Sequence, residues 1–252
     1  MIGIGAGDPD HLTVQAIKAL NQVDAFFVLD KGNEKQDLVD LRRRILAEHV
    51  ANPSYRVVEA RDPDRDRTAD AYANAVHDWR RRRADICERL IRDELGPDER
   101  GAFLVWGDPA LYDSTLAIVE DILSRGTVEF DYEVVPGISS VSALAARHRI
   151  GLNRVGRPIQ ITTGRRLSES LPEGLPDGVD DVVVMLDAHC AFAQIGDDDT
   201  TTIYWGAYIG TPDELLVSGP LRDVADQIQA TRAEAQHRKG WIMDTYLLRR
   251  HP

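Results

Sequence analysis

The sequence has little cysteine and no long hydrophobic run. Its only cysteines, Cys87 and Cys190, stand far apart and outside any Cys-x-x-Cys spacing. A disulfide scaffold is therefore not expected, and a reducing compartment fits this composition. No stretch approaches the ~20 apolar residues that cross a membrane, and no cationic-then-apolar signal peptide opens the chain. We therefore expect a cytoplasmic protein with no membrane-spanning segment.

Basic residues are fewer than acidic ones. The 252 residues include 30 Lys and Arg against 42 Asp and Glu, which gives a net charge of −12 and a pI near 5.0. General nucleic-acid binding is disfavoured, because phosphate recognition needs a basic face. The adjacent His189 and Cys190 lack the spacing of metal ligands, so no metal site is expected. With 43% hydrophobic residues, the chain can form one large domain or two modest ones that share a cleft.

Residues 106–112 have the features of a ligand-binding loop. They read Trp-Gly-Asp-Pro-Ala-Leu-Tyr, follow an apolar run at 102–105 and precede a helical pattern at 116–122. A strand that ends in Gly-Asp-Pro presents backbone amides and a carboxylate at the carboxyl end of a sheet, where open α/β sheets bind ligands. The same residues are ordinary turn formers, so the stretch alone does not distinguish a binding loop from a plain turn.

A glycine-rich loop opens the chain. Glycines alternate over residues 3–7, a helix follows, and a second strand at 25–29 ends at Asp30. The dinucleotide fingerprint is absent, because Asp8 stands where its third glycine is required. The loop is compatible with a Rossmann-type methyltransferase whose donor ribose is held by Asp30, and equally with a turn that binds nothing. Met1 leaves a very short first strand, so the sequence leaves open whether native residues precede it.

Residues 34–95 form a charged, helical segment. The apolar spacing predicts one helix around 38–46 and a longer helix whose N-cap is Thr68, with a short extended piece at 56–59 between them.

Arginine runs occur in both predicted helices, at residues 42–44 and 80–83. The simplest interpretation is a solvated helix face whose aliphatic stems cover apolar surface. The alternative is a wall that binds a polyanionic substrate. Helical geometry places Arg83 beside Trp79 in either case.

A third candidate loop follows the predicted strand at 132–135. It contains a Pro-Gly turn, after which Ser139 or Ser140 can cap the next helix. A plain cap explains these serines as well as a ligand contact does. Beyond them, a hairpin turn at 210–214 and brief helices, the clearest near 224–228, separate short predicted strands at 158–163, 182–186, 201–205, 215–218 and 241–248. This alternation of short strands, turns and brief helices predicts a smaller mixed sheet and therefore a second domain.

Four motifs occur in a fixed order along the chain. They are the glycine loop at 3–10, Gly-Asp-Pro at 107–109, Val-Val-Pro-Gly-Ile-Ser-Ser at 134–140 and Gly-Thr-Pro-Asp at 210–213. Together they closely resemble the tetrapyrrole methylases, the S-adenosylmethionine-dependent enzymes of cobalamin and sirohaem synthesis. The resemblance spans nearly the whole chain.

The resemblance implies an α/β fold of the class III methyltransferase type, with the ligand cleft between two α/β domains. The first, residues 1–138, would have a mostly parallel sheet and a helical insertion at 34–95. The second, residues 139–252, would have a mixed sheet. S-adenosyl-L-methionine would bind as methyl donor and leave as S-adenosyl-L-homocysteine. The substrate would be a small-molecule tetrapyrrole, a precorrin, and the enzyme a homodimer.

The resemblance also implies a set of donor-binding positions. They are Trp106, Gly107, Asp108, Leu111, Ser139, Ser140, Met185, Leu186 and Ala207. The sequence departs from the family's usual pattern at Ala6, where proline is common, and at Trp106, where glycine is common. An indole ring at Trp106 can wall the donor pocket where a glycine would expose the main chain.

Within the family, residues 5–17, 30–32 and 205–208 resemble most closely a deacetylating member of the aerobic route to cobalamin. Methyl transfer from a sulfonium is an in-line displacement, which needs orientation in a dry cleft and no metal. Loss of an acetyl group needs a base or a positioned water, for which the candidates are Asp8, Tyr112 and Asp113. Candidate partners for substrate carboxylates are residues 80–83 and Arg147, Arg149, Arg154, Arg157, Arg165 and Arg166.

Other functions stay open from the sequence. One is a different precorrin or uroporphyrinogen methyltransferase, and another is a Rossmann-type methyltransferase acting on a different small molecule. A binding or assembly protein without activity is a third, because Trp106 departs from the donor-site pattern.

Overall fold

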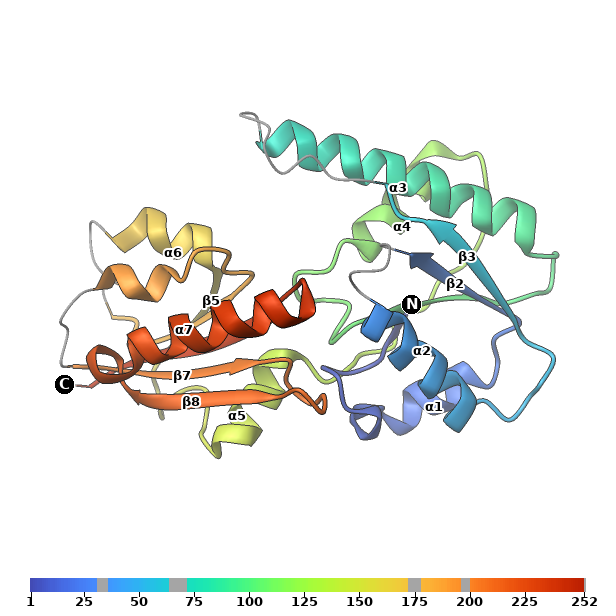
Figure 1. The fold of residues 1–252 in the computed structure, drawn as a ribbon. Helices are drawn as coiled ribbons and strands as arrows, with labels where there is room; N and C mark the ends of the chain where they lie inside the picture. Colours follow the sequence, from blue (N-terminus) through green and yellow to red (C-terminus); the bar gives the residue numbers. More distant parts are fainter. Residues whose placement is uncertain (31–35, 64–71, 172–177, 196–199, 252) are drawn as a thin grey trace. The chain divides into compact units, whose positions relative to one another are not determined.

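The structure is a computed structural model that describes residues 1–30, 36–63, 72–171, 178–195 and 200–251. The chain divides into two compact units, Met1–Ile138 and Ser139–Pro252, and each unit has its own sheet (Figure 1). The first sheet is parallel and the second is mixed, which confirms the predicted α/β fold class. No helix among the described residues is long and apolar enough to cross a membrane.

The first unit is built on four parallel strands in the order β1-β4-β2-β3. Their bounds are Ile2–Gly3 for β1, Ala25–Asp30 for β2, Arg56–Arg61 for β3 and Gly101–Val105 for β4. Because all four strands run in the same direction, their carboxyl ends lie along one edge of the sheet. The glycine loop after β1 and the Gly-Asp-Pro loop after β4 therefore share that edge.

Helices cover both faces of this sheet, as in doubly wound folds. They are α1 (Val14–Leu20), α2 (Gln36–His49), α3 (Tyr72–Glu94) and α4 (Thr115–Arg125). Side chains alternate along β2, so Phe26 packs in a core with α1 and α2, while Phe27 packs in a second core with α3 and α4 (Figure 1). Both cores hold the strands fixed beneath the loops at the carboxyl edge.

The prediction of a strand at 132–135 was wrong. Only Val135 pairs, through one parallel bridge to Ile2. The strand that it meets has only two residues, and Pro136 follows at once without an N–H to donate. The predicted start of the long helix at Thr68 lies outside the described residues, and the described helix runs from Tyr72 to Glu94.

The second unit has a five-stranded sheet in the order β5-β6-β9-β7-β8. Strands β5 and β6 are parallel, and β9 runs antiparallel to both β6 and β7. The carboxyl ends of β5, β6 and β7 therefore meet the amino end of β9 at one edge. The bounds are Ile159–Thr163 for β5, Asp181–Met185 for β6, Thr201–Ala207 for β7, Leu215–Pro220 for β8 and Asp244–Arg250 for β9.

Helices lie on both sides of this second sheet. Trp205 points toward α7 (Leu221–Lys239), whereas its neighbour Gly206 faces Leu144 of α5 (Ser140–His148). A shorter helix, α6 (Gly164–Ser170), follows β5. Helix α7 is much longer than the segment predicted at 224–228. Its buried stripe is Leu221, Ile228, Arg232 and Ala235, so an arginine interrupts the apolar period.

An ion pair with a pH-dependent contribution joins β3 to the loop before β4. Arg56 donates two hydrogen bonds of 2.8 Å to Glu99, and the Gly96 amide donates a third of 2.9 Å. These bonds hold the pKa of Glu99 down at about 2. Because the folded-state pKa is depressed, the stabilisation is complete above the ordinary glutamate pKa of about 4.3 and is lost as pH falls toward 2.

We therefore expect Glu99→Gln to lower the melting temperature at pH 7, and the difference from the parent to shrink as pH falls below about 4. The pair is exposed, so solvent screening limits the effect to a few degrees. Thermal unfolding followed by circular dichroism from pH 7 to pH 3 checks this. A difference that stayed constant over that range would contradict the assignment.

Candidate functional site

The loops after β1 and β4 are joined through glycine main chains. The Gly107 amide donates to the Gly5 carbonyl at 2.8 Å, and the Gly5 amide donates back at 3.3 Å. Both glycines have positive φ, 82° for Gly5 and 71° for Gly107, which side-chain-bearing residues rarely adopt. The two loops therefore form one backbone surface at the carboxyl edge of the sheet.

The Pro-Gly turn at residues 136–137 packs directly on these loops. A Cβ on Gly137 would lie 2.1 Å from the Gly107 carbonyl oxygen and 2.9 Å from main-chain atoms of Gly3. A Cβ on Gly3 would in turn lie 2.6 Å from the Gly137 nitrogen. Three segments far apart in the sequence therefore cross where no side chain fits.

Asp108 fastens this crossing. Its Oδ2 accepts a 2.9 Å hydrogen bond from the Gly137 amide, and its Oδ1 accepts a 2.8 Å bond from the Ala110 amide. The carboxylate predicted to bind the donor thus also binds two backbone amides of its own unit. These two hydrogen bonds fix the positions of the Pro-Gly turn and of the Gly-Asp-Pro loop.

We expect Asp108→Ala to lower the free energy of unfolding by about 2 kcal/mol, because two amides lose a charged acceptor in a half-buried place. Asp108→Asn keeps one acceptor oxygen and should lose about half as much. Urea denaturation of both variants checks this. Equal stability of the alanine variant and the parent would show that the two bonds do not hold the loops.

The three candidate bases lie on the same loops. Asp8 caps the short helix Pro9–His11, accepting from the Asp10 amide at 2.9 Å. Asp113 accepts from the amide of Thr115, the first residue of α4, at 2.6 Å. Tyr112 has a left-handed backbone, with φ of 52°, and its side chain is 45% exposed. On the same loop as Tyr112, Trp106 and Leu111 are both half-buried.

The candidate donor residues of the second unit gather at the edge where β6 and β7 end. Met185 lies opposite Thr245 in the β6–β9 register, and Ala207 lies opposite Asp244 in the β7–β9 register. The Ser140 hydroxyl is 3.2 Å from that of Thr245, which attaches the start of α5 to this edge. Ser139 is the cap of α5, where its hydroxyl accepts from the Ser142 amide at 3.2 Å.

Strained residues follow both of these strand ends. Leu186, directly after β6, has φ of 54° and is 61% exposed, and Tyr208, directly after β7, has φ of 49° and is buried. Such conformations cost of order 1–3 kcal/mol and persist where the surrounding structure imposes them. The sequence reasoning named Leu186 and Ala207 but missed Thr245, which links Ser140 to the edge from a strand a hundred residues away.

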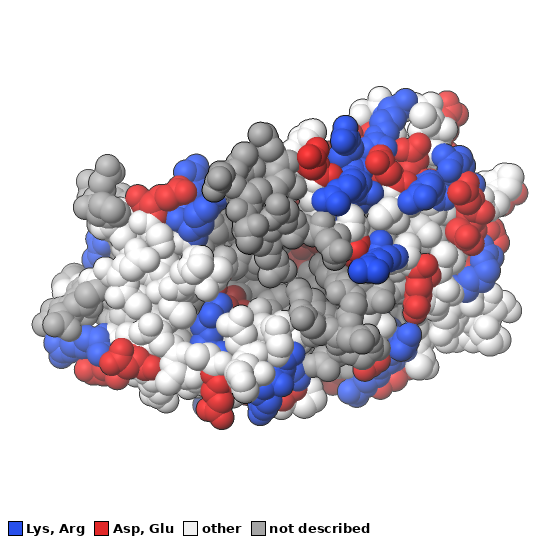
Figure 2. Space-filling model, turned by 45° about the horizontal axis from the view of Figure 1, so that its top comes forward, with Lys and Arg blue, Asp and Glu red and all other residues white. Residues whose placement is uncertain are grey.

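Most of the arginines considered for substrate carboxylates bind acids of the protein itself. Arg83 is buried with its guanidinium 4.7 Å from the Trp79 ring, as predicted, and it pairs with Asp62 at 2.8 Å and with Ser114 at 3.0 Å. Figure 2 shows basic and acidic side chains mixed on the face that it draws. Further ion pairs join Arg81 to Asp78, Arg147 to Glu214, Arg154 to Asp181, Arg157 to Asp180, and Arg165 and Arg166 to Glu169.

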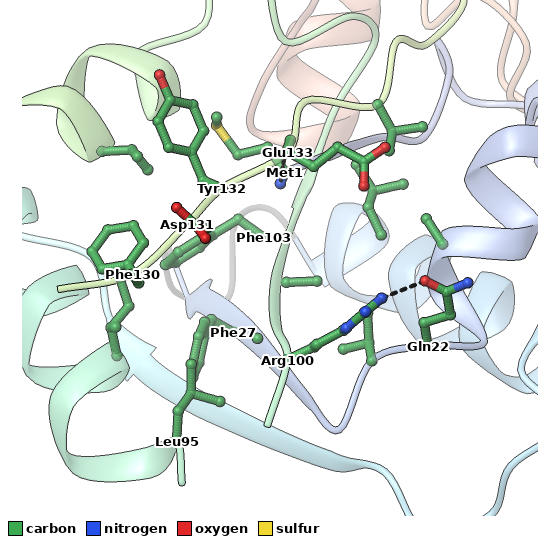
Figure 3. A pocket seen from close by; sticks show the side chains of 18 of the residues that line it. Met1, Gln22, Phe27, Leu95, Arg100, Phe103, Phe130, Asp131, Tyr132 and Glu133 are labelled. Carbon is green, nitrogen blue, oxygen red and sulfur yellow. Dashed lines mark hydrogen bonds between the residues drawn. The ribbon is translucent and has the colours of Figure 1, made fainter. Parts of the chain in front are cut away.

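A cavity of about 470 Å³ lies at the opposite edge of the first sheet (Figure 3). It is lined by Met1, by the start of β4 at 101–103 and by the rings of Phe27 and Phe130, and Arg100 donates to Gln22 at its rim. Because it lies where β4 begins, it is separate from the loops at the carboxyl ends. Among the described residues, no group of three His, Cys, Asp or Glu side chains could hold a metal ion.

Comparison with known proteins supports the family that the order of the motifs indicates. A sequence profile of the Tetrapyrrole (Corrin/Porphyrin) Methylases matches residues 1–225. The chain belongs to the tetrapyrrole methylases. Among members of the family, the precorrin-6A synthase (deacetylating) of a Sinorhizobium species is 51% identical over 250 residues, which are 99% of this chain and 94% of the relative.

Solved structures of tetrapyrrole methylases share the fold. A cobalamin synthesis related protein from Corynebacterium diphtheriae is 38% identical, covers 99% of this chain and 96% of its own, and has a TM-score of 0.80. The uroporphyrin-III C-methyl transferase from Thermus thermophilus, complexed with S-adenosylhomocysteine, is 21% identical over 98% of this chain and 94% of its own. Its TM-score of 0.58 shows likeness of fold alone.

The strand order disfavours the Rossmann-type alternative. In Rossmann sheets the first two strands are neighbours, so the glycine loop lies beside the acidic residue after the second strand. In this tetrapyrrole methylase β4 separates β1 from β2. The ends of β1 and β2 are therefore about 10 Å apart, two strand spacings and not one. The neighbour of the glycine loop is instead the Gly-Asp-Pro loop after β4.

Proposed function

We propose that this chain is a precorrin-6A synthase of the deacetylating type. It would methylate precorrin-5 at ring carbon 1, with loss of acetate, to give precorrin-6A in aerobic cobalamin biosynthesis. The observation that carries the proposal is 51% identity over 99% of the chain to a relative of that name. A homodimer in the cytoplasm is part of the same proposal.

S-adenosyl-L-methionine is the proposed methyl donor, and it supplies an electrophilic methyl group when bound. In the first unit, the fixed main chain at Gly107 and the side chains of Trp106, Asp108 and Leu111 would bind it. In the second unit, the edge at Met185, Leu186 and Ala207 would contact the nucleoside. Ser139 and Ser140 complete the proposed set.

The protein's contribution to methyl transfer is orientation. In-line displacement needs the ring carbon and the methyl group held about 3 Å apart with water excluded. The crossing of Gly3, Gly107 and Gly137 supports this role, because it fixes the main chain of three segments at the carboxyl edge where the donor would bind.

Deacetylation needs an activated water, and we assign its base to Asp8. Attack of water on the acetyl carbonyl releases acetate and leaves an enamine-like carbon on the ring, which then takes the methyl group. Asp8 follows the glycine loop at the carboxyl edge of β1, while Asp113 accepts a shorter hydrogen bond, 2.6 Å, from the first amide of α4. The exposed Tyr112 hydroxyl would donate a hydrogen bond to the acetyl oxygen as negative charge develops there during the attack of water.

Calorimetry with S-adenosyl-L-homocysteine tests the donor part of the proposal. We expect one site per chain with a micromolar dissociation constant. If S-adenosyl-L-homocysteine did not bind, the methyltransferase proposal would be wrong and a binding or assembly role would be favoured. Titration with S-adenosyl-L-homocysteine after Asp30→Ala provides a control, since a Rossmann-type site would lose the donor and the proposed site would not.

A further inference from the structure

Arg232 is a buried arginine at a position of α7 where an amphipathic helix normally has an apolar residue. It lies in the buried stripe of α7 between Ile228 and Ala235, where the apolar period calls for a hydrophobic residue, and it is only 8% exposed. Burying a guanidinium is costly unless its donors are bound. Its partners therefore indicate what the position does.

The guanidinium of Arg232 joins two strand ends. Its Nη2 donates at 2.8 Å to the main-chain carbonyl of Asp187, two residues beyond the end of β6. Its Nε donates at 3.0 Å to the carboxylate of Asp244, the first residue of β9, which lies opposite Ala207 of β7. The Trp205 indole donates to the same carboxylate oxygen at 3.0 Å.

The side chain of Asp187 completes the network. It accepts from the amides of His189 at 2.9 Å and Ala191 at 2.7 Å, and from the Tyr246 hydroxyl at 2.7 Å. Burial, reinforced by the nearby Asp187 carboxylate, raises the pKa of Tyr246 well above its ordinary value, so the phenol stays a donor. A Cβ on Gly164 would lie 2.4 Å from Asp187, so the end of β5 closes over it.

This network lies next to a residue with a strained backbone. Leu186 has a left-handed backbone and an exposed side chain, and it lies between the last residue of β6 and the anchored Asp187. A residue in that region of φ and ψ stays there only when its neighbours are held. Arg232 and Tyr246 hold Asp187 from its carbonyl and its carboxylate.

We propose that Arg232 and Tyr246 are positioning residues that fix the edge at Met185, Leu186 and Ala207, where Leu186 is exposed, for the nucleoside of the methyl donor. The proposal rests on the proposed function, because it is that function which assigns the donor to this edge. Neither residue touches the donor. Their loss lets Leu186 relax from its strained conformation, so the cost falls on donor binding and not on tetrapyrrole binding.

The test measures S-adenosyl-L-homocysteine affinity by calorimetry for the parent and for Arg232→Met, Arg232→Lys and Tyr246→Phe. We expect Arg232→Met to raise the dissociation constant about tenfold or more, because both strand ends lose their common donor. Lysine can reach one partner as a point charge but not bridge two, so Arg232→Lys should fall between. Tyr246→Phe removes a single hydroxyl, and we expect it to weaken binding about threefold.

Arg249→Met is the matched control. Arg249 is a nearly buried arginine on β9 that pairs with fully buried Asp181 at 2.6 Å, at the opposite edge of the same sheet. The Arg249→Met variant should lose stability like Arg232→Met but keep donor affinity within about twofold of the parent.

In turnover, Arg232→Met should raise the KM for the donor and leave the KM for the tetrapyrrole unchanged, whereas misfolding would lower kcat alone.

The outcomes separate the two claims. Parent-like donor affinity in both Arg232→Met and Tyr246→Phe would overturn the positioning role while leaving the proposed function intact. No donor binding by the parent would overturn both. If Arg232→Met does not fold, as circular dichroism would show, then Tyr246→Phe decides, because its change in volume is one oxygen atom.

Discussion

Replacing Gly137 by alanine is expected to lower the free energy of unfolding by about 3 kcal/mol or more. The new methyl group would lie 2.1 Å from the Gly107 carbonyl oxygen and 2.9 Å from main-chain atoms of Gly3. No side chain can rotate away from this clash, because all the near atoms belong to the backbone. Relief requires the loops after β1 and β4 to separate from the Pro-Gly turn.

That separation should also abolish donor binding, since the proposed site uses the same loops. Urea denaturation and calorimetry with S-adenosyl-L-homocysteine measure the two effects on one preparation. Gly151→Ala is the matched control, because a Cβ there meets only one atom, the Asn153 carbonyl oxygen, at 3.5 Å. Parent-like stability of Gly137→Ala would contradict the close crossing of the three segments.

Replacing Asp8 by asparagine is expected to slow acetate release by about a hundredfold or more, the usual contribution of a positioned general base. Asparagine keeps the Oδ1 acceptor for the Asp10 amide, so the cap of the short helix survives while the proton acceptor is lost. Acetate measured by an enzyme-coupled assay, together with donor affinity, separates these two roles.

Asp113→Asn is the comparison for this substitution, because Asp113 also accepts a backbone amide at the start of a helix through Oδ1. We expect its acetate release to stay within about threefold of the parent. If Asp8→Asn releases acetate at the parent rate while Asp8→Ala loses stability, Asp8 is a helix cap and the base lies elsewhere. A slow Asp113→Asn variant would transfer the role to that residue.

Features that depend on short-range chemistry could be predicted from the sequence. The hydroxyl of Ser139 caps α5, and the helical spacing of Trp79 and Arg83 produces their stacking, because each depends on residues within one turn. The family resemblance predicted the fold class through the order of its motifs. The loops at Gly107 and Gly137 were recognised for the same reason.

Features that depend on long-range pairing could not be predicted. Strand β9 inserts between β6 and β7, and only that register brings Thr245 to Ser140. Arg232 breaks the apolar period of α7, so periodicity predicted a short helix where a 19-residue helix exists. The prediction of a strand at 132–135 was wrong because its neighbour, β1, has only two residues with which that segment could pair.

Asp108 shows the limit of motif reasoning most clearly. The motif predicts a donor-binding role for this carboxylate, and the structure adds that its two oxygens accept from the amides of Gly137 and Ala110. Those amides belong to segments 29 and 2 residues away in the chain. A motif predicts which residue stands at a loop, but only the fold shows which backbone amides its polar atoms bind.

The central claim is tested most directly by incubating the purified chain with S-adenosyl-L-methionine and precorrin-5 and analysing the products by mass spectrometry. The proposed function predicts precorrin-6A, S-adenosyl-L-homocysteine and acetate in equal amounts. Methylation without acetate, or methylation of a different precorrin in preference to this one, would contradict the assignment within the family. No methyl transfer to any tetrapyrrole, despite donor binding, would contradict the proposed activity itself.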